Sequence, residues 1–272
     1  MRIMNGQQTD APLLESCQPY FRFRNTLELK VIVCQNAFGV EEVRRIPKAG
    51  GDFRLTAKEK MMAATMEPVN LAGSVLNRSY HVCAFFHTKE EQYRVLMPYY
   101  KEGFERGDRA FHIVDPNRRL EHLRRLEQEG IDVASAESKG QLEVRSWDQA
   151  HVKNGRFDQK QMIETLVDIF SPAKRSPGPL TRGFANMEWA LEDLPGVHDI
   201  VEYETRLNHA LPEYHDPIVC TYDLSRFNAS IVMDIMRTHP MVIIGGILQE
   251  NPFYVPPNEM LKELAERKSD KN

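Results

Sequence analysis

The spacing of hydrophobic and polar residues changes near Tyr80. From there on, short apolar runs alternate with longer segments in which apolar residues recur at helical spacing. The first unit contains an apolar run at 82–86, a polar loop at 87–91, an amphipathic segment at 92–106 and a second apolar run at 110–114. This pattern predicts a strand, a crossover helix and a second, parallel strand.

The same alternation continues through the rest of the chain. Further strands are predicted at 142–146, from 183 to about 186–189, at 217–224 and at 241–244, the last followed by a bend or hairpin at Gly245 and Gly246. Helices are predicted at 118–129, 133–138, 156–173, 196–212, 229–237 and 258–268. The sequence therefore predicts an α/β fold with a mainly parallel sheet and helices on both faces. One main domain would span residues 80–258, with a polar C-terminal helix or tail at 259–272.

Residues 1–79 do not show this alternation. The run at 27–34 is compatible with a strand, but glycine and proline interrupt the pattern elsewhere. We expect a weakly structured N-terminal extension. Met61, Met62 and Met66 also raise the alternative of a start codon further downstream than Met1.

Composition and charge narrow the class of protein. The 272 residues are 42% hydrophobic and 27% charged, and no apolar run approaches the roughly 20 residues that a membrane-spanning helix needs. The N-terminus has no apolar core of the secretory type, so a cytoplasmic location is expected. Residues 1–79 carry 11 Lys+Arg against 8 Asp+Glu, which leaves a net charge of −7 for the remainder. An acidic main domain argues against direct binding of nucleic acid.

Polar and aromatic residues gather where the predicted parallel strands end. This edge holds His87, Thr88, Asp115, Asn117, Trp147, Asp148, Asn186, Glu188, Trp189, Tyr222 and Asp223. Ligands of open parallel sheets bind at that edge, and this set is rich in aromatic rings and carboxylates but poor in lysine and arginine. It suits a small, partly apolar or hydroxylated ligand. The predicted ligand-binding residues are His87, Asp115, Asn186, Glu188, Trp189 and Tyr222, with His81 as a second-rank candidate.

Each of these residues also has a structural interpretation. His81 can cap its strand, Trp189 can belong to the core, and Asp115 can start a turn before Pro116. The four cysteines show no CxxC pairing and are interpreted as buried free thiols. The nine histidines show no ligand spacing, and residues 202–204 are interpreted as a solvated helix face, so neither a metal site nor a cofactor is predicted.

The loop after the first strand excludes the commonest ligand of such folds. Phosphate-binding loops contain glycines that let backbone N–H groups approach the phosphate, and HTKEE at 87–91 has none. Lys89 alone cannot replace them. Catalytic signatures such as HExxH and GxSxG are also absent.

Several segments resemble a known family. They include HVCAFFHTKEEQYRVLMPYYKEGFERGDRAFHIVD, GQLEVRSW, MEWALEDLPG, EYETRLN, CTYDLSRF and RTHPMVIIGGILQENPFYVPP, in order over roughly residues 80–258. Together they resemble the MEDS family, the methanogen/methylotroph, DcmR-type sensory domain. The resemblance implies a three-layer fold related to the RecA and KaiC-like ATPases. It also implies a sensory input module of prokaryotic signalling that binds small hydrocarbon-derived ligands.

Family members often carry an output module beside this domain, and none can be recognised here. The resemblance then implies that a signal leaves through a partner protein, such as a kinase, an anti-sigma-type protein or a transcription regulator, or through a change of homo-oligomer.

The leading hypothesis is a non-catalytic sensor of a small organic ligand. One alternative is an enzyme that uses His87 with Asp115 and Glu188 as acid–base groups. A second is a protein-interaction module without a ligand, and a third is residual ATP binding.

Overall fold

The computed structural model describes residues 17–22, 29–35, 41–46, 68–76, 81–170, 179–211 and 216–270. The chain divides into two compact units, Met1–Glu67 and Pro68–Asn272. The predicted N-terminal extension lies largely outside the described residues. The alternative start at Met61, Met62 or Met66 lies wholly outside them.

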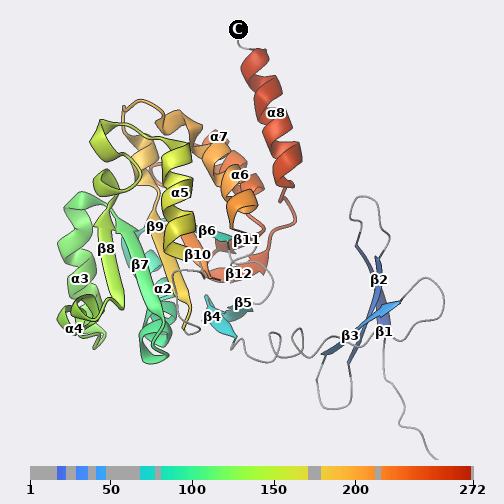
Figure 1. Cartoon of the computed structure of the whole chain (residues 1–272), viewed down its shortest axis with the longest axis horizontal. Coiled ribbons are helices and arrows are strands. Elements are labelled where there is room, and N and C mark those ends of the chain that lie inside the picture. The colour runs from blue at the N-terminus through green and yellow to red at the C-terminus, as the bar shows by residue number, and fades with distance from the viewer. Residues whose placement is uncertain are drawn as a thin grey trace, which may run out of the picture. The chain divides into compact units, whose positions relative to one another are not determined.

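The described part of the first unit is an antiparallel sheet of three strands (Figure 1). β1 (Cys17–Arg22) pairs with β2 (Leu29–Gln35), which pairs in turn with β3 (Glu41–Ile46). The strand predicted at 27–34 corresponds to β2, which begins two residues later.

The second unit contains a seven-stranded sheet in the order β12-β11-β6-β10-β9-β7-β8. All neighbours are parallel except β11 and β12, which form a hairpin. The strands are β6 (His81–Phe86), β7 (Arg109–Val114), β8 (Leu142–Ser146), β9 (Thr181–Asn186), β10 (Ile218–Asp223), β11 (Met241–Ile244) and β12 (Ile247–Glu250). The hairpin turns at Gly245 and Gly246, whose φ values of 60° and 77° suit the two-residue turn that matches strand twist.

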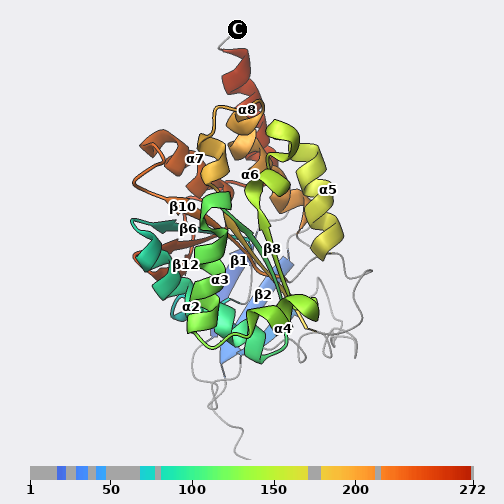
Figure 2. The ribbon, with the colours of Figure 1, turned by 90° about the vertical axis from the view of Figure 1, so that its left-hand side faces the viewer.

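Helices cover both faces of this sheet (Figures 1 and 2). One face packs against α2 (Lys89–Glu105), α3 (Arg119–Gln128) and α4 (Val133–Ser138). The other packs against α5 (Gln159–Phe170), α6 (Ile200–Ala210), α7 (Ala229–Thr238) and α8 (Pro257–Ser269). The predicted α/β architecture, with a mainly parallel sheet between two helical layers, is therefore confirmed.

Alternation along the strands divides the core into two parts. In β6, Cys83 and Phe85 face the α5–α8 layer, whereas Val82, Ala84 and Phe86 face the α2–α4 layer. Successive side chains of a strand point to opposite faces, so a strand buried on both faces is a continuous apolar run.

The main unit begins earlier than the predicted boundary at residue 80. A short hairpin of β4 (Val69–Leu71) and β5 (Ser74–Leu76) belongs to it, and Val69, Leu71 and Leu76 are each 1% exposed. The backbone of Leu248 donates to the carbonyl of Ala72, which ties this hairpin to β12 at the sheet edge. Three-residue strands are too short to give a recognisable sequence pattern.

In the described part of the chain, no helix combines the length and apolarity needed to cross a bilayer.

Candidate functional site

The connection between β6 and α2 is shorter than predicted. Residues 89–91 form the first turn of α2, so only His87 and Thr88 join the strand to the helix. The Thr88 hydroxyl accepts a hydrogen bond from the Glu91 backbone N–H at 3.1 Å, and the Glu91 carboxylate accepts one from the backbone N–H of His87 at 2.8 Å. Thr88 and Glu91 thus cap the start of α2. The polar residues of this segment were predicted to form a loop, so the start of the helix was not recognised. A two-residue connection leaves no loop to enclose a phosphate.

Lys89 forms an internal ion pair at this edge of the sheet. Its Nζ contacts Oε1 of Glu188, a residue of the 3₁₀ turn Glu188–Leu191 that follows β9, and also donates to the side-chain oxygen of Gln92 at 3.3 Å. Glu188 is 3% exposed, and its Oε2 atom has no hydrogen-bond partner among the described residues. The lysine at the start of α2 is therefore already neutralised by a carboxylate of the same chain.

The other residues predicted at this edge lie in different environments. His87 is exposed, while Asp115 caps the 3₁₀ turn Pro116–Arg118 by accepting a hydrogen bond from the backbone of Asn117 at 2.9 Å. Asn186 is buried and donates to the hydroxyl of Thr221 at 3.0 Å.

The two predicted aromatic residues are both buried. Trp189 stacks on His151 with ring centroids 4.7 Å apart, and the hydroxyl of Tyr222 donates to Glu204 at 2.7 Å. None of the seven predicted ligand-binding residues lines the core cavity or the surface groove described next.

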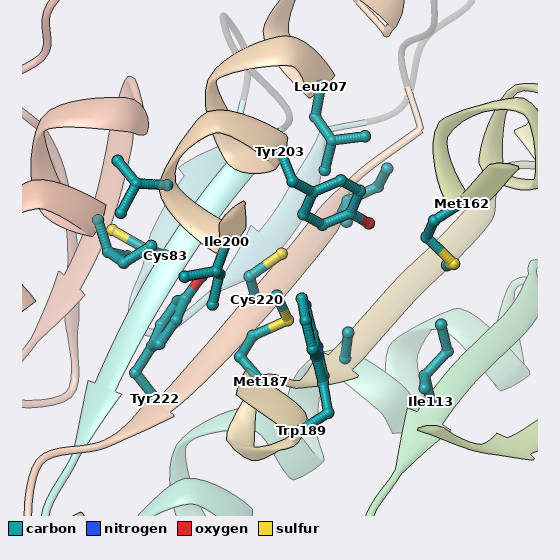
Figure 3. Close-up of a cluster of buried hydrophobic side chains, with 14 of the residues drawn as sticks. Cys83, Ile113, Met162, Met187, Trp189, Ile200, Tyr203, Leu207, Cys220 and Tyr222 are labelled. Carbon is teal, nitrogen blue, oxygen red and sulfur yellow. The ribbon is translucent and has the colours of Figure 1, made fainter. Parts of the chain in front are cut away.

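One of these hollows is a cavity of about 20 Å³ inside the apolar core. It lies between the sheet and the helices α5 and α6, and its walls are almost entirely carbon. Figure 3 shows Ile113, Tyr203, Leu207 and Cys220 of its lining. It is lined by Phe111, Ile113, His151, Leu166, Phe170, Gly183, Phe184, Ala185, Tyr203, Leu207, Ile218 and Cys220. A cavity of this size has room for about one water molecule, but apolar walls keep such cavities dry.

His151 contributes its imidazole ring to the lining of the cavity. Its Nδ1 atom has no hydrogen-bond partner among the described residues. Burial lowers the pKa of His151 to about 3, so its ring is neutral at physiological pH. Its ring packs against Trp189, which places that predicted residue one side chain away from the cavity.

The second hollow is a surface groove of about 410 Å³ between α2 and α3. Its lining is mostly charged or amphipathic and includes Arg94, Lys101, Arg125 and Glu129. This groove lies against the α2–α4 layer, on the opposite side of the sheet from the apolar cavity.

A buried polar cluster centres on Glu204 of α6. Its Oε2 atom lies 3.2 Å from Nε2 of His81, 3.4 Å from Nε2 of His239 and 3.9 Å from Sγ of Cys220. Glu204 and His239 are fully buried, while Cys220 is 3% and His81 7% exposed. We call these four residues the Glu204 cluster.

The interpretation of residues 202–204 as a solvated helix face is wrong for Tyr203 and Glu204, which are 1% and 0% exposed. Glu204 lies three residues after Val201 and three before Leu207, within the apolar stripe of α6. A carboxylate at an apolar position of a helix can be recognised from the sequence, and it would have indicated a functional group here.

The electrostatics of the Glu204 cluster follow from its burial. Burial by itself raises the pKa of Glu204, but hydrogen bonds and charge from His239 and His81 outweigh it and hold that pKa well below its usual range. Burial and the neighbouring Glu204 raise the pKa of the Cys220 thiol. Burial and the charge of His81 lower the pKa of His239. An ionised carboxylate thus lies in the core, surrounded by three groups that can all act as metal ligands.

The sequence does not reveal the Glu204 cluster because its members are far apart in the chain. His81 opens β6, Glu204 lies on α6, Cys220 lies in β10, and His239 comes just before β11. The prediction that the nine histidines make no metal site rested on their spacing in the sequence, and the structure brings two of them together at one carboxylate. His81, a second-rank candidate, and Tyr222 are the predicted residues that the structure brings together there.

The fold is an α/β domain with a mainly parallel sheet, in which only two residues join β6 to α2. The chain belongs to the MEDS family (MEthanogen/methylotroph, DcmR Sensory domain), whose model matches residues 80–240. The resemblance seen in the sequence is thereby confirmed, and the chain carries a sensory domain.

Known proteins similar to this chain include a transcriptional repressor and a KaiC-like protein. The transcriptional repressor DcmR of Methylorubrum extorquens is 26% identical over 161 residues, which are 58% of this chain and 57% of the repressor. The match thus spans a little over half of that relative's length. The crystal structure of the KaiC-like protein PH0186 from Pyrococcus horikoshii OT3 matches with a TM-score of 0.44 at 15% identity, covering 60% of this chain and 69% of that one.

Proposed function

We propose that the domain is a non-catalytic sensor that binds a small, largely apolar organic molecule in the cavity between the sheet and α5 and α6. The observation that carries this proposal is the cavity itself, with apolar walls and one unpartnered imidazole nitrogen, inside a domain of a sensory family. A ligand with a hydrocarbon body and one hydroxyl or other hydrogen-bonding group matches that lining.

The geometry of the carboxyl edge supports an organic ligand over a nucleotide. Nucleotide phosphates need several free backbone N–H groups and an available cation. Here the connection is two residues long, and Lys89 is paired with the buried carboxylate of Glu188.

The same edge favours binding over catalysis. An acid–base pair would require His87 to approach Asp115 or Glu188 within hydrogen-bond reach. His87 is exposed, Asp115 caps a turn, and no hydrogen bond or ion pair among the described residues links the three.

The small volume of the cavity suggests how binding is transmitted. A ligand of more than one or two heavy atoms fits only if α5 or α6 moves outward, so binding selects a conformation with a larger cavity. Lys268 of α8 forms ion pairs with Asp199 at 3.2 Å and with Glu202 of α6 at 2.8 Å. A displacement of α6 would therefore reach α8, where a partner protein or a second copy of the chain could detect it.

A thermal-shift screen of the full chain tests the proposal. The panel consists of short alcohols, halogenated alkanes, small organic acids and nucleotides. A ligand present at a hundred times its Kd adds about 2.7 kcal/mol of apparent stability. We expect a response to at least one small organic compound and none to nucleotides.

A matched pair of variants localises the response. Ala185→Val adds two methyl groups at the cavity wall and should abolish it, whereas Ala110→Val makes the same change in the core on the opposite face of the sheet and should retain it. A response that persists in Ala185→Val, or no response to any small organic compound, would refute the cavity as the binding site.

A further inference from the structure

We propose that the Glu204 cluster binds one Zn²⁺ ion through Nε2 of His81, Nε2 of His239, Sγ of Cys220 and Oε2 of Glu204. This proposal concerns a second site and does not depend on the organic ligand. These four ligand atoms all lie within 4.8 Å of one another, and all four residues are buried.

Three of the distances between ligand atoms of the cluster are close to those around a tetrahedral metal ion. Bonds of about 2.0–2.3 Å to nitrogen, oxygen and sulfur place neighbouring ligand atoms about 3.3–3.6 Å apart. In the structure, Oε2 of Glu204 lies 3.2 Å from His81 and 3.4 Å from His239, and the sulfur of Cys220 lies 3.6 Å from His81. Binding therefore requires only shifts of a few tenths of an ångström at these contacts.

Hydrogen bonds outside the cluster orient the His81 ring. The side-chain N–H groups of Asn208 donate to the carbonyls of Glu204 and Thr238 at 3.1 and 2.6 Å, which leaves its Oδ1 facing His81. Nδ1 of His81 then donates to that oxygen at 3.2 Å. In the neutral ring, the lone pair lies on Nε2, the atom that faces the cluster.

His239 and Glu204 are oriented in the same way. Nδ1 of His239 donates to the carbonyl of Ile235 at 2.9 Å, so its Nε2 also carries the lone pair. That Nε2 atom has no hydrogen-bond partner in good geometry among the described residues, although Glu204 is close. The second carboxylate oxygen of Glu204 accepts from Tyr222 at 2.7 Å. Outer hydrogen bonds of this kind are typical of metal ligands.

Charge balance favours a metal ion over protons alone. When both imidazoles are neutral and protonated at Nδ1, their Nε2 lone pairs face the carboxylate, and a proton or a metal ion between them removes that repulsion. One added proton bridges only one of the two imidazoles to Glu204, and two would leave a buried net charge of +1 on the His–Glu–His group, whereas one metal ion contacts all the lone pairs at once. A Zn²⁺ ion with one thiolate and one carboxylate is neutral overall, and coordination deprotonates a thiol despite its raised pKa.

The ligand set also indicates which metal is bound. Two imidazoles, a thiolate and a carboxylate at tetrahedral spacing favour Zn²⁺, whereas Mg²⁺ and Ca²⁺ prefer oxygen ligands at higher coordination number. All four positions come from the protein, so the site is closed, as structural zinc sites are. It would connect β6, α6, β10 and the start of β11, and Cys220 would join it to the wall of the organic-ligand cavity.

Cobalt substitution of the full-length protein tests the site. Elemental analysis of the purified chain should find about one zinc per chain. After chelation, Co²⁺ should produce a thiolate-to-cobalt charge-transfer band and intense visible bands of tetrahedral coordination. Zn²⁺ should then displace the cobalt, and chelation should lower the melting temperature.

Two buried cysteines on neighbouring strands provide a matched control (Figure 3). Cys83 is paired in register with Cys220 but lies outside the cluster. Cys220→Ser should lose the charge-transfer band, whereas Cys83→Ser should retain it. Tyr222→Phe, which removes an outer hydrogen bond only, should weaken zinc affinity by about 10- to 100-fold.

The proposal is overturned if the wild-type chain neither contains zinc nor gives the cobalt bands, or if the two cysteine variants lose them equally. Failure here leaves the organic-ligand screen unaffected, because that response is measured separately and mapped by Ala185→Val. A metal-free chain that still responds to an organic ligand would therefore refute the zinc site alone.

Discussion

Acidification is expected to destabilise the sensory domain because it buries neutral histidines. His112 and His122 are 1% and 0% exposed, and Nδ1 of His112 lies 2.8 Å from Nε2 of His122. The hydroxyl of Tyr93 lies 2.9 Å from the other nitrogen of His122, whose ring stacks on Phe184. Burial and the nearby charge of Arg119 lower the pKa of His122 to about 3. Burial and the neighbouring His122 hold the pKa of His112 well below its usual range.

The sign and size of the effect follow from linkage. In the unfolded chain these rings bind protons below a pKa of about 6.5, whereas in the folded domain they do not. Protonation of the unfolded chain therefore does not lower the folding stability above pH 6.5, but lowers it progressively as the pH falls toward 3. His122 alone should cost about 1.4 kcal/mol per pH unit in this range, or about 2 kcal/mol at pH 5. Against a total of about 5–15 kcal/mol, that loss is readily measured.

Urea unfolding between pH 8 and pH 4 provides the assay. His122→Phe removes the titrating group and keeps an aromatic ring against Phe184, so its free energy of unfolding should fall less steeply with acid than that of the wild type, by about 1.4 kcal/mol per pH unit. The variant also loses two hydrogen bonds, but this shifts the whole curve and not its slope. Parallel curves for the wild type and His122→Phe would refute the reasoning.

Three further outcomes are expected. Arg182 is 2% exposed and donates to Asp108 at 2.7 Å, so Arg182→Met should cost about 3–5 kcal/mol in urea unfolding by removing the buried ion-pair partner of that carboxylate. Arg106→Met, which removes a longer and more exposed pair to the same Asp108, should cost less than about 1 kcal/mol; equal losses would contradict this account. Gly196→Ala places a Cβ atom 2.3 Å from a backbone oxygen at φ +88°, so it should destabilise by about 1–3 kcal/mol more than Gly140→Ala, where φ is +70° and the space is open; similar melting temperatures would contradict it. ATP with Mg²⁺ should leave the melting temperature unchanged, and a dose-dependent rise would refute the loss of nucleotide binding.

Cys220 connects the two proposals, since its side chain lines the organic-ligand cavity and belongs to the Glu204 cluster. A metal ion would anchor α6 to β6 and β10 at one end. The rest of the helix, including Leu207, would remain free to shift as the cavity fills. Measuring the ligand response with and without zinc would show whether the bound metal ion limits how far α6 moves.

Periodicity was sufficient to predict most of the fold of the main domain. The strands of a parallel sheet are apolar on both faces, and the helices repeat at 3.6 residues, so 82–86, 110–114 and 142–146 correspond closely to β6, β7 and β8. The missing glycines in 87–91 also excluded a phosphate-binding loop from the sequence alone. The start of α2 was not predicted, because its first turn is polar and is defined by the Thr88 and Glu91 hydrogen bonds.

The candidate sites depended on the tertiary structure. Strand-end residues such as Glu188 and Trp189 were identified as polar or aromatic, but only packing shows that one pairs with Lys89 and the other stacks on His151. The Glu204 cluster joins residues from four separate elements, so no local spacing records it. The sequence by itself determined the order of strands and helices, because that depends on periodicity within a few turns. The fold decided which buried groups meet, because a carboxylate becomes a metal ligand only when distant segments bring other lone pairs within 4 Å.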